Sequence, residues 1–255
     1  MRNLCVIPAR MASSRFPGKP LEKLLGLELV LHVYDRCQSA ENLDRLVIAT
    51  CDVDIQAACK RHGAEVVMTH HDHPGAVDRT AEVVEKIGAR LPEDGLVLMV
   101  QGDEALVTPD MINAVVDAFE ESNTPVVNLA SPIENIADHD DTNVVKVACA
   151  PNGRALFFSR APIPSRVRAK RPMMLQQTGV IGFSKSFLYT FLRLERTPLE
   201  LAEGIDMLRT LENGYCIQIV STERPTIGVD TPEDLARAEA LLCVSPEIKN
   251  YTDLE

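Results

Sequence analysis

The chain has 255 residues, of which 45% are hydrophobic, and it carries a formal net charge of -11. A chain of this size can bury a substantial core in one large domain. The acidic excess excludes a general nucleic-acid binder and a protein held by an anionic membrane, because no overall field attracts polyanions. No apolar run is long enough to span a bilayer, and the first residues lack the pattern of a secretory leader. We therefore expect a cytoplasmic protein with no nucleic-acid or membrane partner.

The cysteines number seven, lie scattered along the chain and never form a CxxC arrangement. Such spacing predicts neither a disulfide framework nor a zinc site. We expect reduced thiols that belong mostly to the core.

The first half of the chain alternates strand-like and helix-like segments. Apolar, mostly β-branched runs predict strands at residues 4–8, 46–50, 65–68 and 96–101. Apolar residues at helical spacing predict helices at residues 29–39, 53–62, 79–87 and 109–121. This alternation predicts an α/β fold with a doubly wound, mostly parallel sheet.

After residue 123 the pattern becomes mixed. Strands are predicted at residues 126–131, 144–150 and 216–220, and helices at residues 184–194, 201–213 and from 232 onward. Thr231 is placed to cap the last helix, with Pro232 as its first residue and Asp234 as the acid of a capping box. We expect one domain over residues 1–255, with a mixed α+β part inserted at about 131–213.

One segment of that part, residues 161–172, is unsuited to a core element. It holds three prolines, three arginines and a lysine. Such an irregular, basic stretch is either an active-site loop or an arm that packs on a partner subunit.

The strongest local signal is a cationic loop directly after the first predicted strand. Arg10, Arg15 and Lys19 lie in the sequence PARMASSRFPGKP at residues 8–20. A loop that leaves the carboxyl end of a parallel strand lines the ligand crevice, and cations with backbone amides near small residues suit a polyphosphate. The spacing is neither that of a P-loop nor that of a dinucleotide-binding glycine loop. A solvated basic loop is the alternative, which three cations at this place disfavour.

Two carboxylates also follow predicted strands. Asp103 lies in QGDE at 101–104, and Asp230 lies in VDTPEDL at 229–235. Mg²⁺ takes oxygen ligands, typically one or two carboxylates together with substrate phosphates. Asp103 could instead hydrogen-bond its own backbone in a turn, whereas Asp230 lies outside the helix cap that accounts for Asp234. Two carboxylates that face a cationic loop predict a metal and phosphate site.

These stretches, in this order, resemble the CMP-Kdo synthetase family, the 3-deoxy-manno-octulosonate (Kdo) cytidylyltransferases. The family opening IPARxxS[ST]RxPGKPL is matched at residues 7–21, and its QGDEP is matched at residues 101–105 with Ala105 in place of proline. Further blocks agree at residues 143–147, 155–164, 208–214 and 229–235. The resemblance covers nearly the whole chain, and it implies a GT-A-like nucleotidyltransferase fold and a homodimer.

The resemblance also implies an activity and a set of site residues. The enzyme would transfer CMP from CTP to the anomeric hydroxyl of an acidic 2-keto sugar and release pyrophosphate, with Mg²⁺ as cofactor. The catalytic residues would be Arg10, Arg15, Lys19 and Asp103. CTP would be bound by Pro8, Ala9, Arg10, Lys19, Arg79 and Gln101. Mg²⁺ would be held by Asp103 and Asp230. The sugar would be bound by Arg160, Gln177, Asp206 and Met207. Arg160 either meets the sugar carboxylate or merely anchors the proline-rich segment.

The chain departs from the family on the sugar side. Where the family reads KHIG[IV]YAY, this chain has QQTGVIGF, so Gln177 replaces a histidine and Ile181 a tyrosine. Where the family reads LEQLR, Asp206 and Met207 replace glutamate and glutamine. A site built to hydrogen-bond a hydroxyl disfavours ligands that lack it, because buried polar groups are left unpaired. These changes favour a related acceptor such as a deoxy, amino or acylated ulosonic acid, and neutral drift with unchanged Kdo specificity is the alternative.

Two further functions compete with this one. The first is a cytidylyltransferase that acts on a phosphonate or a polyol phosphate. The second is a non-catalytic nucleotide-binding relative. The joint presence of the three loop cations with Asp103 and Asp230 argues against the second, because a pure sensor needs no pair of metal carboxylates.

Overall fold

The structure, a computed structural model, describes residues 1–13, 15–169 and 172–244. The described strands form one nine-stranded sheet and a separate ribbon of β2 (Lys23–Leu24) and β3 (Leu27–Glu28). The main path of the sheet runs in the order β11-β7-β10-β6-β1-β4-β5. No helix in these described ranges is both long enough and apolar enough to cross a bilayer.

One half of the sheet is parallel. It consists of β6 (Leu96–Val100), β1 (Asn3–Pro8), β4 (Arg45–Thr50) and β5 (Val66–Met68). Each strand runs parallel to its neighbour. These strands confirm the four that were predicted in the first half of the chain, and their carboxyl ends meet at one edge.

The other half contains the antiparallel pairs. β10 (Leu175–Ser184) lies between β6 and β7 (Val126–Pro132) and is antiparallel to both. β11 (Ile217–Ser221) follows β7 in parallel. β8 (Lys146–Cys149) pairs with the start of β10 and with β9 (Ala155–Ser159). The sequence did not predict β9 or β10. In β10 the three residues after Leu175 are polar and the strand contains two glycines, which obscures the strand pattern.

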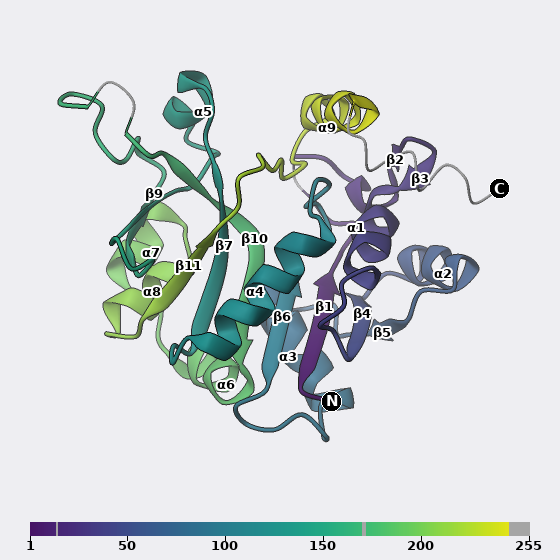
Figure 1. Ribbon diagram of the computed structural model, residues 1–255. Coiled ribbons are helices and arrows are strands. Elements are labelled where there is room, and N and C mark those ends of the chain that lie inside the picture. Colours follow the sequence, from purple (N-terminus) through teal and green to yellow (C-terminus); the bar gives the residue numbers. More distant parts are fainter. Residues whose placement is uncertain (14, 170–171, 245–255) are drawn as a thin grey trace.

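Helices cover both faces of the sheet, as Figure 1 shows. α1 (Leu29–Gln38), α2 (Val53–His62) and α4 (Pro109–Glu121) contribute buried side chains to the core on one face. α3 (Ala76–Ile87) and α6 (Lys185–Arg193) do so on the other. The doubly wound α/β fold with a mostly parallel central sheet is thereby confirmed.

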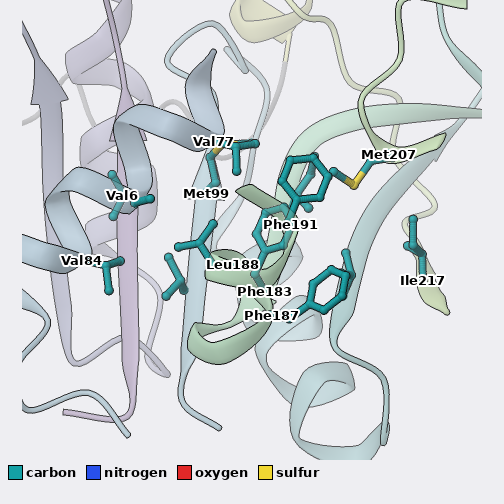
Figure 2. Packing of buried hydrophobic residues seen from close by; sticks show 14 of the residues in the cluster. Val6, Val77, Val84, Met99, Phe183, Phe187, Leu188, Phe191, Met207 and Ile217 are labelled. Atoms are coloured by element: carbon teal, nitrogen blue, oxygen red, sulfur yellow. The ribbon is translucent and has the colours of Figure 1, made fainter. Parts of the chain in front are cut away.

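Aromatic side chains dominate the core around α6 (Figure 2). The ring centroids of Phe183 and Phe191 are 5.9 Å apart. Leu188 and Met207 are fully buried in the same cluster. Burying a side chain of this size stabilises the fold by about 1.5 to 3 kcal/mol. The part of the chain beyond residue 175 is therefore fixed to the main sheet and shares its core.

The remaining helices are short except the last. α5 (Ile136–Asp140), α7 (Pro198–Glu203) and α8 (Met207–Glu212) precede α9 (Pro232–Val244). The single helix predicted at 201–213 is wrong, because Gly204 adopts φ 65° and ends α7 before α8 begins.

The cap predicted for α9 is confirmed. The Asp234 backbone N–H donates to Thr231 Oγ1 at 3.1 Å, and the Thr231 N–H donates to Asp234 Oδ2 at 3.0 Å. This reciprocal pair accounts for Asp234 and leaves Asp230 outside the cap.

The cysteines are free thiols, as expected. Cys5, Cys37 and Cys59 are buried, whereas the other four are at least partly exposed. Cys149 is one of these four, and it packs against a core cluster, so four of the seven cysteines belong to the core or border it, as expected.

Candidate active site

A cavity of about 330 Å³ opens at the carboxyl ends of β1 and β6. Each of the six residues predicted to bind CTP lines it, namely Pro8, Ala9, Arg10, Lys19, Arg79 and Gln101. The strand-end rule for parallel sheets accounts for this convergence.

Lys19 is the centre of the charged cluster in this cavity. It begins a 3-10 helix (Lys19–Leu21) directly after Gly18, whose φ of 81° gives the sharp turn that brings the lysine inward. Its Nζ donates to Asp103 Oδ2 and to the Val229 carbonyl, both at 2.6 Å, and to Asp230 Oδ1 at 3.2 Å. Burial by itself lowers the pKa of Lys19, but the two carboxylates outweigh it and raise the pKa above its ordinary value. Lys19 therefore remains charged.

Arg15 completes the contact between the cationic loop and the carboxylates. Its Nη2 lies 2.9 Å from Asp230 Oδ2, and its Nη1 donates to Asn143 Oδ1 at 3.5 Å. Two cations that are close to each other in sequence thus contact two carboxylates, Asp103 and Asp230, that are 127 residues apart in the chain. This is the arrangement that the sequence predicted.

The opposite side of the cavity offers further groups for an anion. Arg79 is buried and donates through Nη1 to Thr69 and, at 3.3 Å, to the His70 carbonyl. Its Nη2 is buried without a partner in the described part of the chain. Gly75 and Ala76, at the start of the 12-residue helix α3, line the same cavity. A helix N-terminus and an unpaired guanidinium nitrogen both favour a negatively charged ligand here.

Asp103 and Asp230 fit a magnesium ion in their donor chemistry. Their oxygens converge on one ammonium group, and their side chains are 20% and 35% exposed. Within residues 1–13, 15–169 and 172–244, no group of three or more His, Cys, Asp or Glu could enclose a metal. A pair of carboxylates that leaves other positions to water and phosphate is what Mg²⁺ prefers.

A second cavity, of about 500 Å³, lies beside the first. Arg15, Gln101, Asp103 and Asp230 line both cavities, so the carboxylates stand where the two join. The predicted sugar-binding residues Arg160, Gln177 and Asp206 line the second cavity, as does Ile181.

Met207 does not fit the role predicted for it. It is fully buried in the core beside α6 and is absent from the lining of the second cavity (Figure 2). The substitution of an apolar thioether at this position therefore belongs to core packing, because the side chain is buried among apolar residues.

Arg160 makes the contacts of an anchor. Its guanidinium donates to the carbonyls of Glu203 at 2.6 Å, Thr142 at 2.9 Å and Gly204 at 3.5 Å. These hydrogen bonds hold the start of the proline-rich segment, residues 161–172, against the chain at residues 142 and 203–204. Such contacts agree with the alternative that Arg160 anchors this segment. The side chain still lines the cavity. Residues 170 and 171 of the proline-rich segment lie outside the described residues.

Lys146 stabilises the backbone on both sides of this contact. It is fully buried, and its Nζ donates to the carbonyls of Asp141, Val144 and Arg160 at 2.6 to 2.7 Å. Burial lowers the pKa of Lys146. Three carbonyl oxygens satisfy the ammonium group and hold the loop around residues 141–144 in place.

Glu104 is a buried acid that directly follows Asp103. It is 5% exposed, its Oε1 accepts from the Gly179 N–H, and its Oε2 has no partner among the described residues. Burial and the neighbouring charge of Asp103 raise the pKa of Glu104 to about 7. Glu104 also lines the second cavity.

Sequence reasoning missed Glu104 and Lys146 as residues of the site, and also Asn128, whose Oδ1 accepts a hydrogen bond from Gln177 Nε2 at 2.8 Å. The first two lie inside the blocks at 101–105 and 143–147, so their motifs contained a signal that went unused. Asn128 carried only a weak signal, a polar residue within a buried strand.

Comparisons with known proteins agree with this geometry. The profile of the cytidylyltransferase family matches residues 4–222. The chain is 44% identical to the 3-deoxy-manno-octulosonate cytidylyltransferase of Syntrophotalea carbinolica, over 93% of this chain and 97% of that relative. It is 47% identical to the protein of the same name from Syntrophobacter fumaroxidans, over 92% and 94%. The chain belongs to the 3-deoxy-manno-octulosonate cytidylyltransferase family.

This cytidylyltransferase is also similar to solved structures. A CMP:2-keto-3-deoxy-manno-octonic acid synthetase complexed with CTP matches with a TM-score of 0.87 at 31% identity, over 95% of this chain and 99% of that one. A 4-diphosphocytidyl-2C-methyl-D-erythritol synthase from Anaerococcus prevotii matches with a TM-score of 0.64 at 14% identity, over 95% and 96%. The second likeness shows a common fold only. The protein is an enzyme, a nucleotidyltransferase.

Proposed function

We propose that this cytidylyltransferase transfers CMP from CTP to the anomeric hydroxyl of a 3-deoxy-2-ulosonic acid, either Kdo or a modified Kdo-like acid, and releases pyrophosphate with the help of Mg²⁺. The observation that carries the proposal is the junction of two cavities at Asp103, Asp230 and Lys19. The relatives named for Kdo and the similar structure named for its complex with CTP support it.

The reaction is an in-line displacement. The anomeric oxygen of the acceptor forms a bond to the α-phosphorus of CTP while the bond from that phosphorus to the bridging oxygen of pyrophosphate breaks. The proton of the anomeric hydroxyl leaves to solvent, and pyrophosphate departs as the anion. Arg10, Arg15 and Lys19 neutralise the charge that spreads over the phosphoryl oxygens. Mg²⁺ held by Asp103 and Asp230 would add Lewis-acid stabilisation of the same oxygens.

Pyrophosphate release tests this function. We expect release that requires CTP, Mg²⁺ and an ulosonic acid together, and that Asp103→Asn or Asp230→Asn lowers by about 100-fold or more. Asp94→Asn is the matched control, because Asp94 is exposed and pairs with Arg2 at the surface. Turnover with a phosphonate or polyol phosphate instead would assign the enzyme to those acceptors. CTP binding without turnover of any acceptor would favour a non-catalytic relative.

Two copies of the chain associate, in our proposal, through the part at residues 131–213. Leu156 on β9 is 53% exposed, Val167 in the proline-rich segment 86%, and Met173 75%. Light scattering should give twice the chain mass of 28.1 kDa. The double variant Leu156→Lys and Met173→Lys should give a monomer, whereas Leu241→Lys on α9 should not. A monomeric unmodified protein would refute the association.

A further inference from the structure

Along one wall of the second cavity, the side-chain N–H groups already donate to other protein atoms and are not available to a ligand. Gln177 Nε2 donates to Asn128 Oδ1 at 2.8 Å. Asn128 Nδ2 in turn donates to three backbone carbonyls, those of Leu129, Thr178 and Val180. Since a carbonyl can only accept, the nitrogen of Asn128 is fixed, its oxygen must accept, and Gln177 must present its nitrogen inward. The Gln177 oxygen has no donor within the described ranges, and the residue lines the cavity.

Gln176 repeats this pattern one residue earlier. Its Nε2 donates to Ser131 Oγ and to the Thr226 carbonyl, both at 2.8 Å. The carbonyl again fixes the nitrogen on the protein side. Gln176 lines the same cavity, but as the neighbour of Gln177 in β10 it points to the opposite face of the sheet, so the two amide groups do not converge on one ligand group.

Asp206 adds a negative charge to this wall. It is half-buried at the start of α8, and its carboxylate caps no helical N–H. Arg209 acts on it only at a distance, because its Nε and Nη2 donate to Glu200 at 2.8 and 2.6 Å. Burial raises the pKa of Asp206, against the opposing charge of Arg209. A cationic ligand group would offset this desolvation cost.

Glu104 adds a carboxyl group to the lining of the same cavity. It is 5% exposed, and its Oε2 is buried without a partner among the described residues, so this oxygen is closed off from a ligand. Around the whole cavity, carboxyl-bearing side chains number seven and arginines three. The oxygens of Gln177 and Asp206 that lack a protein donor among the described residues therefore accept hydrogen bonds from a ligand.

We infer that the acceptor presents a protonated amino group to Gln177 and Asp206, so that the preferred substrate is an amino-ulosonic acid. A hydroxyl offers one donor and brings two acceptor lone pairs, whereas an ammonium group offers three donors, no acceptor and a compensating charge. The inference rests on the proposed function and names the class of acceptor for the same cavity.

The experiment compares kcat/KM for Kdo with analogues in which one hydroxyl at a time is replaced by an amino group. At least one amino analogue should exceed Kdo by about ten-fold or more, the range of a hydrogen bond to a charged group. N-acetylation of that analogue should abolish the gain, because it removes the charge and two of the donors. Kdo surpassing every amino analogue would overturn the inference and leave the proposed function intact. Absence of pyrophosphate release with every ulosonic acid would overturn the proposed function itself.

The variant Asp206→Asn tests whether Asp206 causes the preference for the amino analogue over Kdo. The ratio of kcat/KM for the amino analogue to that for Kdo should fall by about ten-fold or more in this variant, and it should remain unchanged in Asp94→Asn. Calorimetric affinity for CTP reports whether the variant is folded, since Asp206 does not line the first cavity. Should Asp206→Asn fail to fold, Asp206→Glu retains the charge and should keep the preference. An unchanged ratio in a folded Asp206→Asn would refute the assignment of the ammonium group to this wall.

Discussion

Lys19 keeps two carboxylates of like charge close together, since its ammonium binds both Asp103 and Asp230. The variant Lys19→Met lacks this positive charge. The two carboxylates then repel each other in the free enzyme, and the charge that develops on the phosphoryl oxygens during the reaction loses one stabilising group. We expect kcat to fall about 100-fold or more in a pyrophosphate-release assay. Lys23→Met should stay within about two-fold, because Lys23 pairs with Glu28 at the surface. A Lys19→Met enzyme with unchanged kcat would exclude this lysine from the chemistry.

The raised pKa of Glu104 leads us to predict that the stability of the metal-free protein depends on pH. Its pKa of about 7 lies above the ordinary value of 4.5, so the folded state binds more protons than the unfolded state between these values. Stability contributed by protonated Glu104 is therefore present at low pH and is lost as the pH rises towards 7 and beyond. Between about pH 5 and pH 8 the loss is about 2 to 3 kcal/mol in the free energy of unfolding.

Urea unfolding with a chelator measures this loss in matched variants. Glu104→Gln should lack that part of the pH slope, whereas Glu120→Gln, an exposed change on α4, should retain it. Parallel slopes for Glu104→Gln and the unmodified protein would show that Glu104 titrates near its ordinary pKa.

At the scale of elements, Gly204 divides what the sequence predicted as one helix. Its φ of 65° is a conformation that side chains with Cβ rarely adopt, although a Cβ built there would meet nothing closer than Arg160 at 3.9 Å. Gly204→Ala should therefore cost about 1 to 2 kcal/mol of stability through backbone strain alone. Gly228→Ala should change stability by less than about 0.5 kcal/mol, because its φ is ordinary and its surroundings are open. Equal stabilities of the two variants by chemical denaturation would remove the strain argument.

The elements that the sequence predicted best are those whose pattern is local. β1, β4, β6 and α9 have continuous apolar runs or a complete cap, so a few neighbouring residues define them. β10 lacks such a pattern, because a register shift between Gln177 and Ile181 interrupts its pairing with β7. The Asn128 amide replaces the missing backbone bonds there, and that contact spans 50 and 52 residues of sequence. Compensation over such a distance cannot be inferred from the local sequence.

At the scale of the molecule, the nucleotide side was more predictable than the acceptor side. Arg10, Lys19 and Asp103 follow strands whose ends must meet at one edge of a parallel sheet, so topology alone brings them together. The acceptor side is built from β10, the loop after residue 203 and the segment after residue 160, whose relative placement depends on tertiary packing. Met207 illustrates the limit, since a helical position next to Asp206 gave no indication of which side chain faces the core.

The position of Arg15 where the two cavities join leads to a prediction about how the enzyme binds both substrates. Arg15 lines both cavities and reaches Asp230 on one side and Asn143 on the other, whereas Arg10 lines only the first. Arg15→Met should raise the KM for CTP and the KM for the acceptor, each by about ten-fold or more, because charge-assisted bonds are lost to both ligands. Arg10→Met should raise only the KM for CTP. Steady-state kinetics with each substrate varied in turn distinguishes the two. An Arg15→Met enzyme whose acceptor KM is unchanged would mean that Arg15 serves the nucleotide alone, and that the ligands meet through the carboxylates and Lys19.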